Sequence, residues 1–171
     1  DAILLHASLP PAAAPDWAAQ LLGALPYAWR LELEGLAPDA RVASLVALAL
    51  ALCWAARLLG APPSLRDLMR DTACKPHFAG GPHFSVSHGA TRVAALVTAH
   101  CEVGLDLECA DAHSDLHTLR HWTTTEAVLK ASGLGLRAIN EVEIARTGDA
   151  AIVRGRRYCV TPVQLAPDAI A

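Results

Sequence analysis

The sequence lacks the features that mark several common classes of protein. None of its five cysteines forms a CxxC pair, so neither a zinc site nor a disulfide scaffold is indicated, and we expect reduced thiols. The formal net charge is −3, which gives no basic footprint for nucleic acid. The first residues also lack the basic start and apolar core of a secretory signal peptide. We therefore expect a cytoplasmic protein that binds no nucleic acid.

The sequence also lacks an apolar run long enough to cross a bilayer. The most apolar stretch, residues 42–56, lies between Arg41 and Arg57. It is shorter than the roughly 20 residues that a transmembrane helix needs. Pro38 is placed to start a helix and Gly60 to stop it. We predict a buried core helix here and no membrane contact.

Apolar residues are what the chain has in abundance. Hydrophobic residues make up 53% of the 171 positions and charged residues 18%, a balance typical of a folded globule. The length suits one domain or two small halves with a shared core. We divide the chain into an N-terminal half, residues 1–82, which holds the long apolar helix, and a C-terminal half, residues 83–171.

Acidic residues alternate with apolar ones at 103–108, Val-Gly-Leu-Asp-Leu-Glu. This period of two predicts a strand with one buried face. Asp106 and Glu108 would leave that strand on the same side, roughly 6 to 7 Å apart. Two carboxylates held in this way are candidate ligands for a cation.

A second regular pattern, which includes an acidic residue, follows at 122–130. Trp122, Glu126 and Lys130 recur every four residues, so a helix would align them in one stripe. If the helix crosses the strand, Glu126 joins Asp106 and Glu108. Three carboxylates favour a hard divalent cation, and Mg²⁺ suits because it takes oxygen ligands and leaves room for phosphate.

Each of these residues also has a simpler interpretation. The carboxylates at 106 and 108 could form an ordinary solvated strand face. Thr123 and Glu126 fit a capping box, in which the glutamate bonds a backbone N–H and holds no metal. Lys130 could be a solvent-facing helix lysine, and His88 a plain turn residue.

Other strands and one helix can be read from the same patterns. We predict strands at residues 83–87, 93–98, 102–108, 141–144, 150–153, 157–160 and 170–171, and a helix from 123 to 132 that Gly133 closes.

The sequence contains two further clusters, one of histidines and one of arginines. His113, His117 and His121 are spaced by four and could line up on a helix to bind zinc or copper, although an exposed polar segment is the simpler interpretation. Arg146 and the basic residues at 154–157 suggest either a solvated strand edge or a docking rim for an acidic partner.

Taken together, three blocks of sequence resemble the 4′-phosphopantetheinyl transferases, and in particular their longer, monomeric type, which acts on peptide and polyketide synthetase carrier proteins. The blocks are Phe84-Ser85-Val86-Ser87-His88, the acidic stretch at 103–108, and the stretch from Trp122 to Leu136. They occur in the order that the family has. Cys74-Lys75-Pro76 resembles a further block, and before residue 72 the likeness is confined to residues 41–45.

This resemblance implies a fold, a reaction and a set of site residues. The fold would be α+β, with two similar halves related by a pseudo-twofold axis, each a small antiparallel sheet packed with a long helix. The reaction would transfer 4′-phosphopantetheine from coenzyme A to a carrier-protein serine with Mg²⁺, releasing 3′,5′-ADP. The implied residues are Asp106, Glu108 and Glu126 for the metal, Glu126, Lys130 and Asp106 for catalysis, and Lys75, Ser87, His88, Lys130 and Arg41 for coenzyme A.

The chain departs from the family pattern in three places. Thr125 stands where a lysine usually precedes the helix glutamate, only thirteen residues separate Glu108 from Trp122, and the region before Arg41 has no lysine. The alternative is therefore a catalytically weak or inactive member that binds coenzyme A or a carrier domain.

Overall fold

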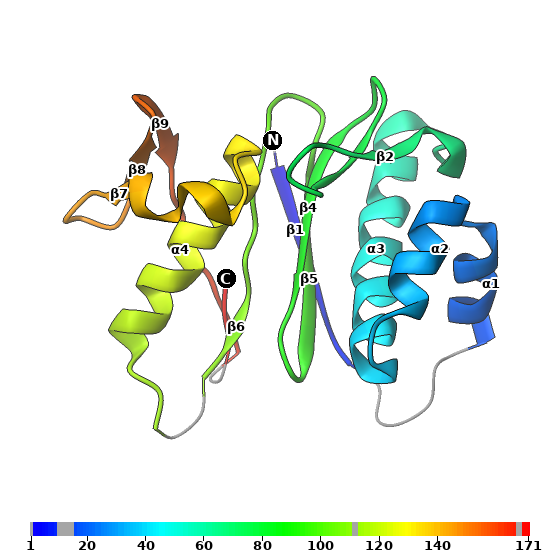
Figure 1. Cartoon of the computed structure of the whole chain (residues 1–171), viewed down its shortest axis with the longest axis horizontal. Coiled ribbons are helices and arrows are strands. Elements are labelled where there is room, and N and C mark those ends of the chain that lie inside the picture. The colour runs from blue at the N-terminus through cyan, green and yellow to red at the C-terminus, as the bar shows by residue number, and fades with distance from the viewer. Residues whose placement is uncertain (1, 10–15, 111–112, 167–168) are drawn as a thin grey trace.

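Two long helices, each packed on its own three-stranded antiparallel sheet, form the main body of the protein (Figure 1). The computed structural model describes residues 2–9, 16–110, 113–166 and 169–171. Helix α3 (Pro38–Leu59) packs on the sheet with strand order β1 (Ala2–Ser8), β5 (Arg92–Thr98) and β4 (His83–His88). Helix α4 (Leu116–Ser132) packs on the sheet with order β7 (Glu143–Ile144), β8 (Ala150–Val153) and β9 (Arg156–Cys159). The class is α+β, as predicted.

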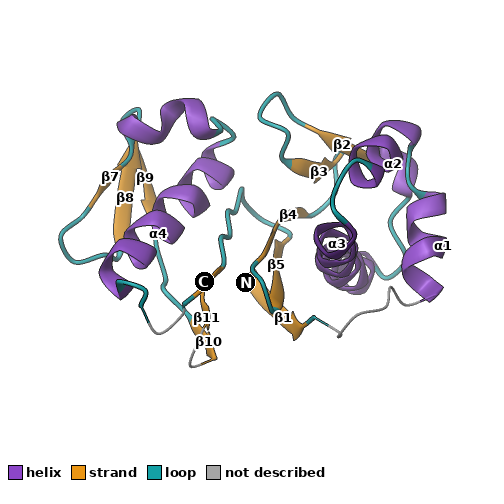
Figure 2. Ribbon diagram, turned by 60° about the horizontal axis from the view of Figure 1, so that its bottom comes forward, coloured by secondary structure: helices purple, strands orange, loops and turns teal. Residues whose placement is uncertain are grey.

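Smaller elements complete the chain. They are α1 (Asp16–Ala24), α2 (Tyr27–Glu34), the hairpin of β2 (Leu68–Arg70) and β3 (Pro76–Phe78), the small sheet of β10 (Gln164–Ala166), β11 (Ala169–Ile170) and β6 (Glu108–Cys109), and two 3₁₀ helices, Leu65–Asp67 and Leu136–Glu141. Figure 2 shows α3 and α4 on opposite sides of the molecule, with β5 and the loop that follows it between them.

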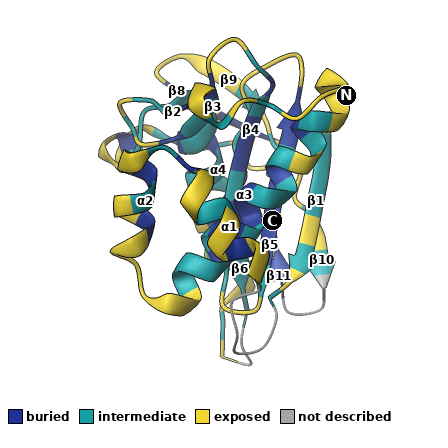
Figure 3. Ribbon diagram, turned by 90° about the vertical axis from the view of Figure 1, so that its right-hand side faces the viewer, coloured by how far each residue is buried: buried dark blue, intermediate teal, exposed yellow. Residues whose placement is uncertain are grey.

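Helix α3 begins and ends where the sequence predicts. Pro38 occupies the first turn, where its missing N–H is not needed, and Gly60 ends the helix in the left-handed conformation at φ 73°. Its apolar face packs against the inner face of the first sheet, where Phe84 and Val97 are buried. Complete burial of such side chains contributes about 1.5–3 kcal/mol each. Helices α1 and α2 cover the outer side, and their outward faces are exposed (Figure 3).

The 22 residues of α3 exceed the apolar run that marked it in the sequence. By length and composition alone α3 could cross a membrane, a test that core helices of soluble proteins also pass. Here α3 lies against β4 and β5 as the central helix of the N-terminal layer.

Strands β4 and β5 follow residue 82, the boundary predicted between the two halves. Both strands pair into the sheet that contains β1, and both pack against α3. The layer built on α3 therefore contains residues on both sides of position 82.

The predicted strand at 102–108 is wrong for most of its length. Only Glu108 and Cys109 form a strand, β6, while residues 102–107 run without a strand partner. The predicted helix at 123–132 is too short at its start, because α4 already begins at Leu116. Strand β1, which Ala2–Ser8 form, was not predicted, and neither were helices α1 and α2.

Candidate functional site

Two serines of β4 hold the segment that carries the acidic residues. Phe84 and Val86 face the core beneath α3, so the intervening Ser85 and Ser87 face the opposite way. The Leu105 N–H donates to Ser85 Oγ at 3.0 Å, and the Leu107 N–H donates to Ser87 Oγ at 3.2 Å. These two hydroxyls take the place of the strand-to-strand hydrogen bonds that residues 102–107 lack.

Gly104 brings the same segment onto helix α4. A Cβ at this position would overlap the carbonyl oxygen of Ala127 and the backbone nitrogen of Ala131. Only a residue without a side chain can approach a helix backbone so closely. The contact places Asp106, two residues further on, beside the α4 residues Glu126 and Lys130.

Asp106 lies at the centre of the site. It is only 4% exposed, and its Oδ1 accepts hydrogen bonds from Ser87 Oγ at 2.9 Å and from Lys130 Nζ at 2.6 Å. Its Oδ2 is buried without a hydrogen-bond partner. Because a buried carboxylate oxygen normally has a donor or a cation beside it, this oxygen is the best single indication of a ligand position.

Two glutamates share the space around Asp106. Burial raises the pKa of Glu126, the negative charge of Asp106 raises it further, and Lys130, with its Nζ 3.8 Å from Glu126 Oε2, opposes both. Burial and Asp106 likewise raise the pKa of Glu108, and the Trp122 side chain opposes them by a hydrogen bond. Burial is the larger cause of both raised pKa values, and repulsion from the Asp106 charge, which a cation would relieve, is the second.

The capping-box interpretation of Glu126 is wrong. The N-cap of α4 is Asp115, whose side chain accepts from the backbone N–H of His117 and Thr118. Thr123 therefore lies inside the helix, where its hydroxyl donates to the Leu119 carbonyl. Glu126 is thus free of a capping role and faces the groove described next.

The acidic residues line a groove of about 390 Å³ that reaches from α4 to α2 and α3. From the predicted site it contains Ser87, His88, Asp106, Glu108, Glu126 and Lys130. The sequence stretches that supplied these residues are far apart, so their meeting is a property of the fold. A solvated strand face and a solvent-facing Lys130 are both inconsistent with these positions.

His88 connects the groove to α3. Its Nε2 lies 3.3 Å from Ser44 Oγ. Burial lowers the pKa of His88, and the nearby charge of Lys130 lowers it further. The ring is therefore mainly neutral near pH 7 and can serve as a hydrogen-bond donor or acceptor.

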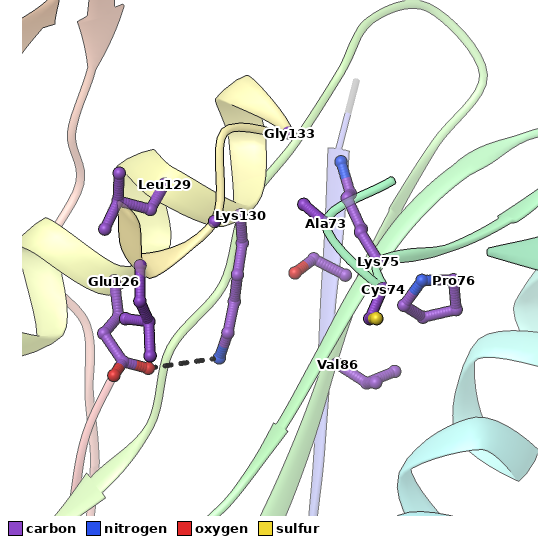
Figure 4. Close-up of a pocket in the computed structure, with 12 residues that line it drawn as sticks. Ala73, Cys74, Lys75, Pro76, Val86, Glu126, Leu129, Lys130 and Gly133 are labelled. Atoms are coloured by element: carbon purple, nitrogen blue, oxygen red, sulfur yellow. Dashed lines mark ion pairs between the residues drawn. The ribbon is translucent and has the colours of Figure 1, made fainter. Parts of the chain in front are cut away.

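Lys75 lies in a neighbouring space of about 260 Å³, which Glu126 and Lys130 also line (Figure 4). Its Nζ forms an ion pair with Glu102 at 2.8 Å and donates to the Val103 carbonyl at 2.9 Å. In Figure 4 the Lys75 side chain points away from Glu126 and Lys130. It ties the hairpin of β2 and β3 to the segment that carries Asp106.

Arg41 is engaged elsewhere. Its guanidinium donates to the carbonyls of Leu33, Glu34 and Leu36, at 3.0, 2.9 and 3.2 Å, and so closes the carboxyl end of α2. Among the residues that the structure describes, Arg41 lines neither of these two spaces.

Arg70 is a groove residue that the sequence did not single out. Its guanidinium stacks on the Trp29 ring at 3.8 Å and pairs with Glu32 at 2.9 Å. Arg70 and Trp29 lie 41 positions apart, in stretches without a recognisable motif, so no local pattern in the sequence indicates that they meet. A stacked arginine in a groove is a suitable partner for phosphate or a planar ring.

The remaining predicted clusters lie away from the groove. His113 precedes α4, whereas His117 and His121 lie on its exposed side, so the three do not share one helix face. Arg154 forms a bidentate ion pair with Glu141 on the surface, in keeping with a solvated strand edge.

The donor set around Asp106 fits a hard cation. Within the described ranges no three His, Cys, Asp or Glu side chains are already arranged to hold a metal ion. The buried Asp106 Oδ2, with Glu108 and Glu126 beside it, nevertheless offers the all-oxygen set that Mg²⁺ prefers. At present the ammonium of Lys130 supplies the positive charge at Asp106 Oδ1.

A comparison with models of known protein families gives no match. A search of curated proteins likewise finds no similar sequence.

Proposed function

We propose that this protein transfers 4′-phosphopantetheine from coenzyme A to a serine of an acyl or peptidyl carrier protein and releases 3′,5′-ADP. The observation that carries the proposal is the meeting of Asp106, Glu126 and Lys130 with Ser87 and His88 in one groove. These residues belong to the three sequence blocks that resemble the phosphopantetheinyl transferases. The three blocks lie apart in the sequence, and a fold shared with the phosphopantetheinyl transferases would explain why they line one groove.

In the proposed reaction the carrier serine oxygen bonds to the phosphorus nearer the pantetheine, and the phosphorus–oxygen bond to 3′,5′-ADP breaks. Negative charge grows on the phosphate oxygens, so positioning and cations supply most of the rate enhancement. Lys130 lies within the groove and can place its ammonium on the diphosphate. Ser87, His88 and Arg70 line the same groove and can hold the remaining phosphate and the base.

Asp106, Glu108 and Glu126 would hold Mg²⁺. A bound Mg²⁺ would neutralise phosphate charge and orient the diphosphate for displacement. The Asp106 Oδ2 supports this assignment, because it is buried and has no hydrogen-bond partner among the described residues.

The serine proton needs an acceptor, and the candidates are Glu126 and a water that the metal would hold. Burial and Asp106 raise the pKa of Glu126, which makes its carboxylate a better proton acceptor near neutral pH. The charge of Lys130 acts in the opposite direction and lowers this pKa.

The architecture supports the same family. Each long helix lies on a three-stranded antiparallel sheet, α3 on β1-β5-β4 and α4 on β7-β8-β9. We propose that the two layers are related by a pseudo-twofold axis, with the groove between them as the active site. The protein would then act as a monomer in the cytoplasm.

The second candidate is a family member that binds coenzyme A or a carrier domain with little turnover. Two observations favour it. Thr125 is buried and bonded to the His121 carbonyl, so it supplies no cation where the family usually has a lysine. Lys75 and Arg41 are also held by other groups, which leaves fewer cations for coenzyme A.

The two candidates differ in whether a carrier protein gains mass. The purified protein is incubated with coenzyme A, Mg²⁺ and apo carrier proteins from fatty-acid, polyketide and peptide synthetases, and each carrier is weighed. The enzyme predicts a gain of about 340 Da, the mass of one phosphopantetheine carried by coenzyme A. Coenzyme A binding without a mass gain would select the second candidate.

Asp106→Asn and Asp16→Asn form a matched pair for this assay. Both remove one carboxylate charge, but Asp16 lies exposed on α1 and does not line the groove. We expect Asp106→Asn to lower the transfer rate at least about a hundredfold and Asp16→Asn to leave it unchanged. Equal activity of all three proteins would overturn the proposed site.

A further inference from the structure

A further cavity borders the segment that carries Asp106, and Asp106 is the one lining residue that it shares with the groove. Its volume is about 580 Å³, within the range of roughly 300–1,000 Å³ that small-molecule pockets occupy. Its walls come from β1, residues 101–106, one face of α4, β9 and the last residues of the chain. Ala2 of β1 and Ala171 both line it.

Most of the wall is apolar. On one side stand Leu4 of β1 and Leu96 of β5, and on another stand Val103, Val160 and Val163. All five are only half-buried, although they lie between the two packed layers. Their exposed surface faces the cavity, where an apolar ligand would gain by covering it.

Three of the five charged residues of the wall are arginines. Arg120 of α4 and Arg156 and Arg157 of β9 all line the cavity, and all three side chains are exposed. Arg156 lies over the Tyr158 ring at 5.3 Å, and in the described part of the chain none of the three forms an ion pair.

The two acidic residues of the wall are already neutralised. Glu102 pairs with Lys75 and His83, and Asp106 pairs with Lys130. The charge that remains unmatched around this cavity is therefore positive, which favours an anionic group at its rim.

We propose that this cavity binds a small amphiphilic anion, with an apolar chain against the leucines and valines and one carboxylate or phosphate head at Arg120 and Arg157. A pocket that is mostly apolar with a few convergent charged groups is the usual design for such a ligand. The inference does not depend on the transferase activity, because none of Ser87, His88, Glu126 or Lys130 lines this cavity.

Calorimetric titration of the whole protein tests this proposal. The ligands are decanoate and decyl phosphate below their micelle concentrations, with decanol, decyltrimethylammonium and propionate as comparisons. We expect saturable binding of the two ten-carbon anions only, and the tighter of the two identifies the preferred head. Binding of decanol or the ammonium compound as tight as that of decanoate would overturn the proposal, as would the absence of any binding.

Variants locate the ligand. Replacing both arginines, Arg120→Gln with Arg157→Gln, should weaken anion binding about tenfold, the loss of about 1.4 kcal/mol. Ala2→Trp adds a bulky ring from an exposed position of the wall and should abolish binding. Arg146→Gln, an exposed arginine outside the cavity, is the matched control and should bind normally.

Two further results separate this inference from the proposed function. Glu126→Gln should lose carrier loading and keep anion binding, since Glu126 does not line this cavity. If the arginine pair and Ala2→Trp both bind decanoate as the unmodified protein does, the ligand lies elsewhere and the proposal fails. Circular dichroism of each variant verifies that it is folded.

Discussion

Gly104 lies directly on the backbone of Ala127, so closely that a methyl group at position 104 would overlap the Ala127 carbonyl oxygen. This contact joins the segment after β5 to helix α4, and it is the reason that Asp106 and Glu126 meet. In the sequence Gly104 occupies a non-apolar position of an alternating pattern. In the fold it is a contact between the segment after β5 and helix α4.

We therefore expect Gly104→Ala to destabilise the protein by about 3 kcal/mol or more, because the overlap is with backbone atoms that cannot turn aside. Urea unfolding measures the change. Gly23→Ala in α1 is the control, since nothing lies within 4 Å of a Cβ there, and it should stabilise the helix slightly. Equal effects of the two substitutions would show that the layers are not in contact at Gly104.

Lys130→Gln should separate metal binding from catalysis. In the structure the Lys130 ammonium lies 2.6 Å from Asp106 Oδ1, so its charge would repel a divalent cation held at the neighbouring Oδ2. Its removal should raise the affinity for Mg²⁺ about tenfold, because one repelling charge is gone. The transfer rate should fall, because a charge on the phosphate is lost.

Mg²⁺ titration of the protein without coenzyme A measures the first effect, and carrier loading measures the second. Arg137→Gln, an exposed change of the same charge in the 3₁₀ helix after α4, serves as the control. An unchanged Mg²⁺ affinity in Lys130→Gln would mean that the cation does not bind at Asp106.

Arg41→Ala should act on stability, since three carbonyls at the end of α2 lose their donor. We expect the free energy of unfolding to fall by about 2 kcal/mol. Coenzyme A affinity should stay nearly the same, whereas Arg70→Gln, a groove substitution, should lower it. Loss of coenzyme A binding in Arg41→Ala without a loss of stability would contradict this prediction. It would indicate that Arg41 binds coenzyme A, as the family resemblance implies.

Glu102→Gln should give a destabilisation that depends on pH. Partial burial alone raises the pKa of Glu102, but the hydrogen bond and charge of Lys75, with His83, outweigh it and hold the pKa below its ordinary 4.5. A lowered folded-state pKa contributes stability above the unfolded value, and that contribution is lost as the pH falls through the folded value.

The difference in unfolding free energy between the unmodified protein and Glu102→Gln should therefore be about 1 kcal/mol at pH 7, because Glu102 is about half exposed although Lys75 is buried, and should shrink below pH 4. Urea unfolding at several pH values between 3 and 7 measures it. A difference that stays constant over this range would show that the Glu102 charge does not stabilise the fold.

Local chemistry in the sequence determined a good part of this protein. Pro38 and Gly60 mark the ends of α3, Gly133 ends α4, and β4, β5 and β8 follow from apolar residues bounded by turns. The acidic residues 106, 108 and 126 were also selected from their spacing along the chain, although residues 102–107 do not form the strand that the spacing of 106 and 108 predicted.

The tertiary structure decided how those residues are supported and what surrounds them. Residues 102–107 form no strand, since Ser85 and Ser87 hydroxyls take the hydrogen bonds that a partner strand would have taken. Arg70 and Trp29 line the groove from separate elements, and Arg41 donates hydrogen bonds to carbonyls at the end of α2. Such contacts join residues far apart in sequence, and their energies depend on distances in space, which spacing along the chain does not record.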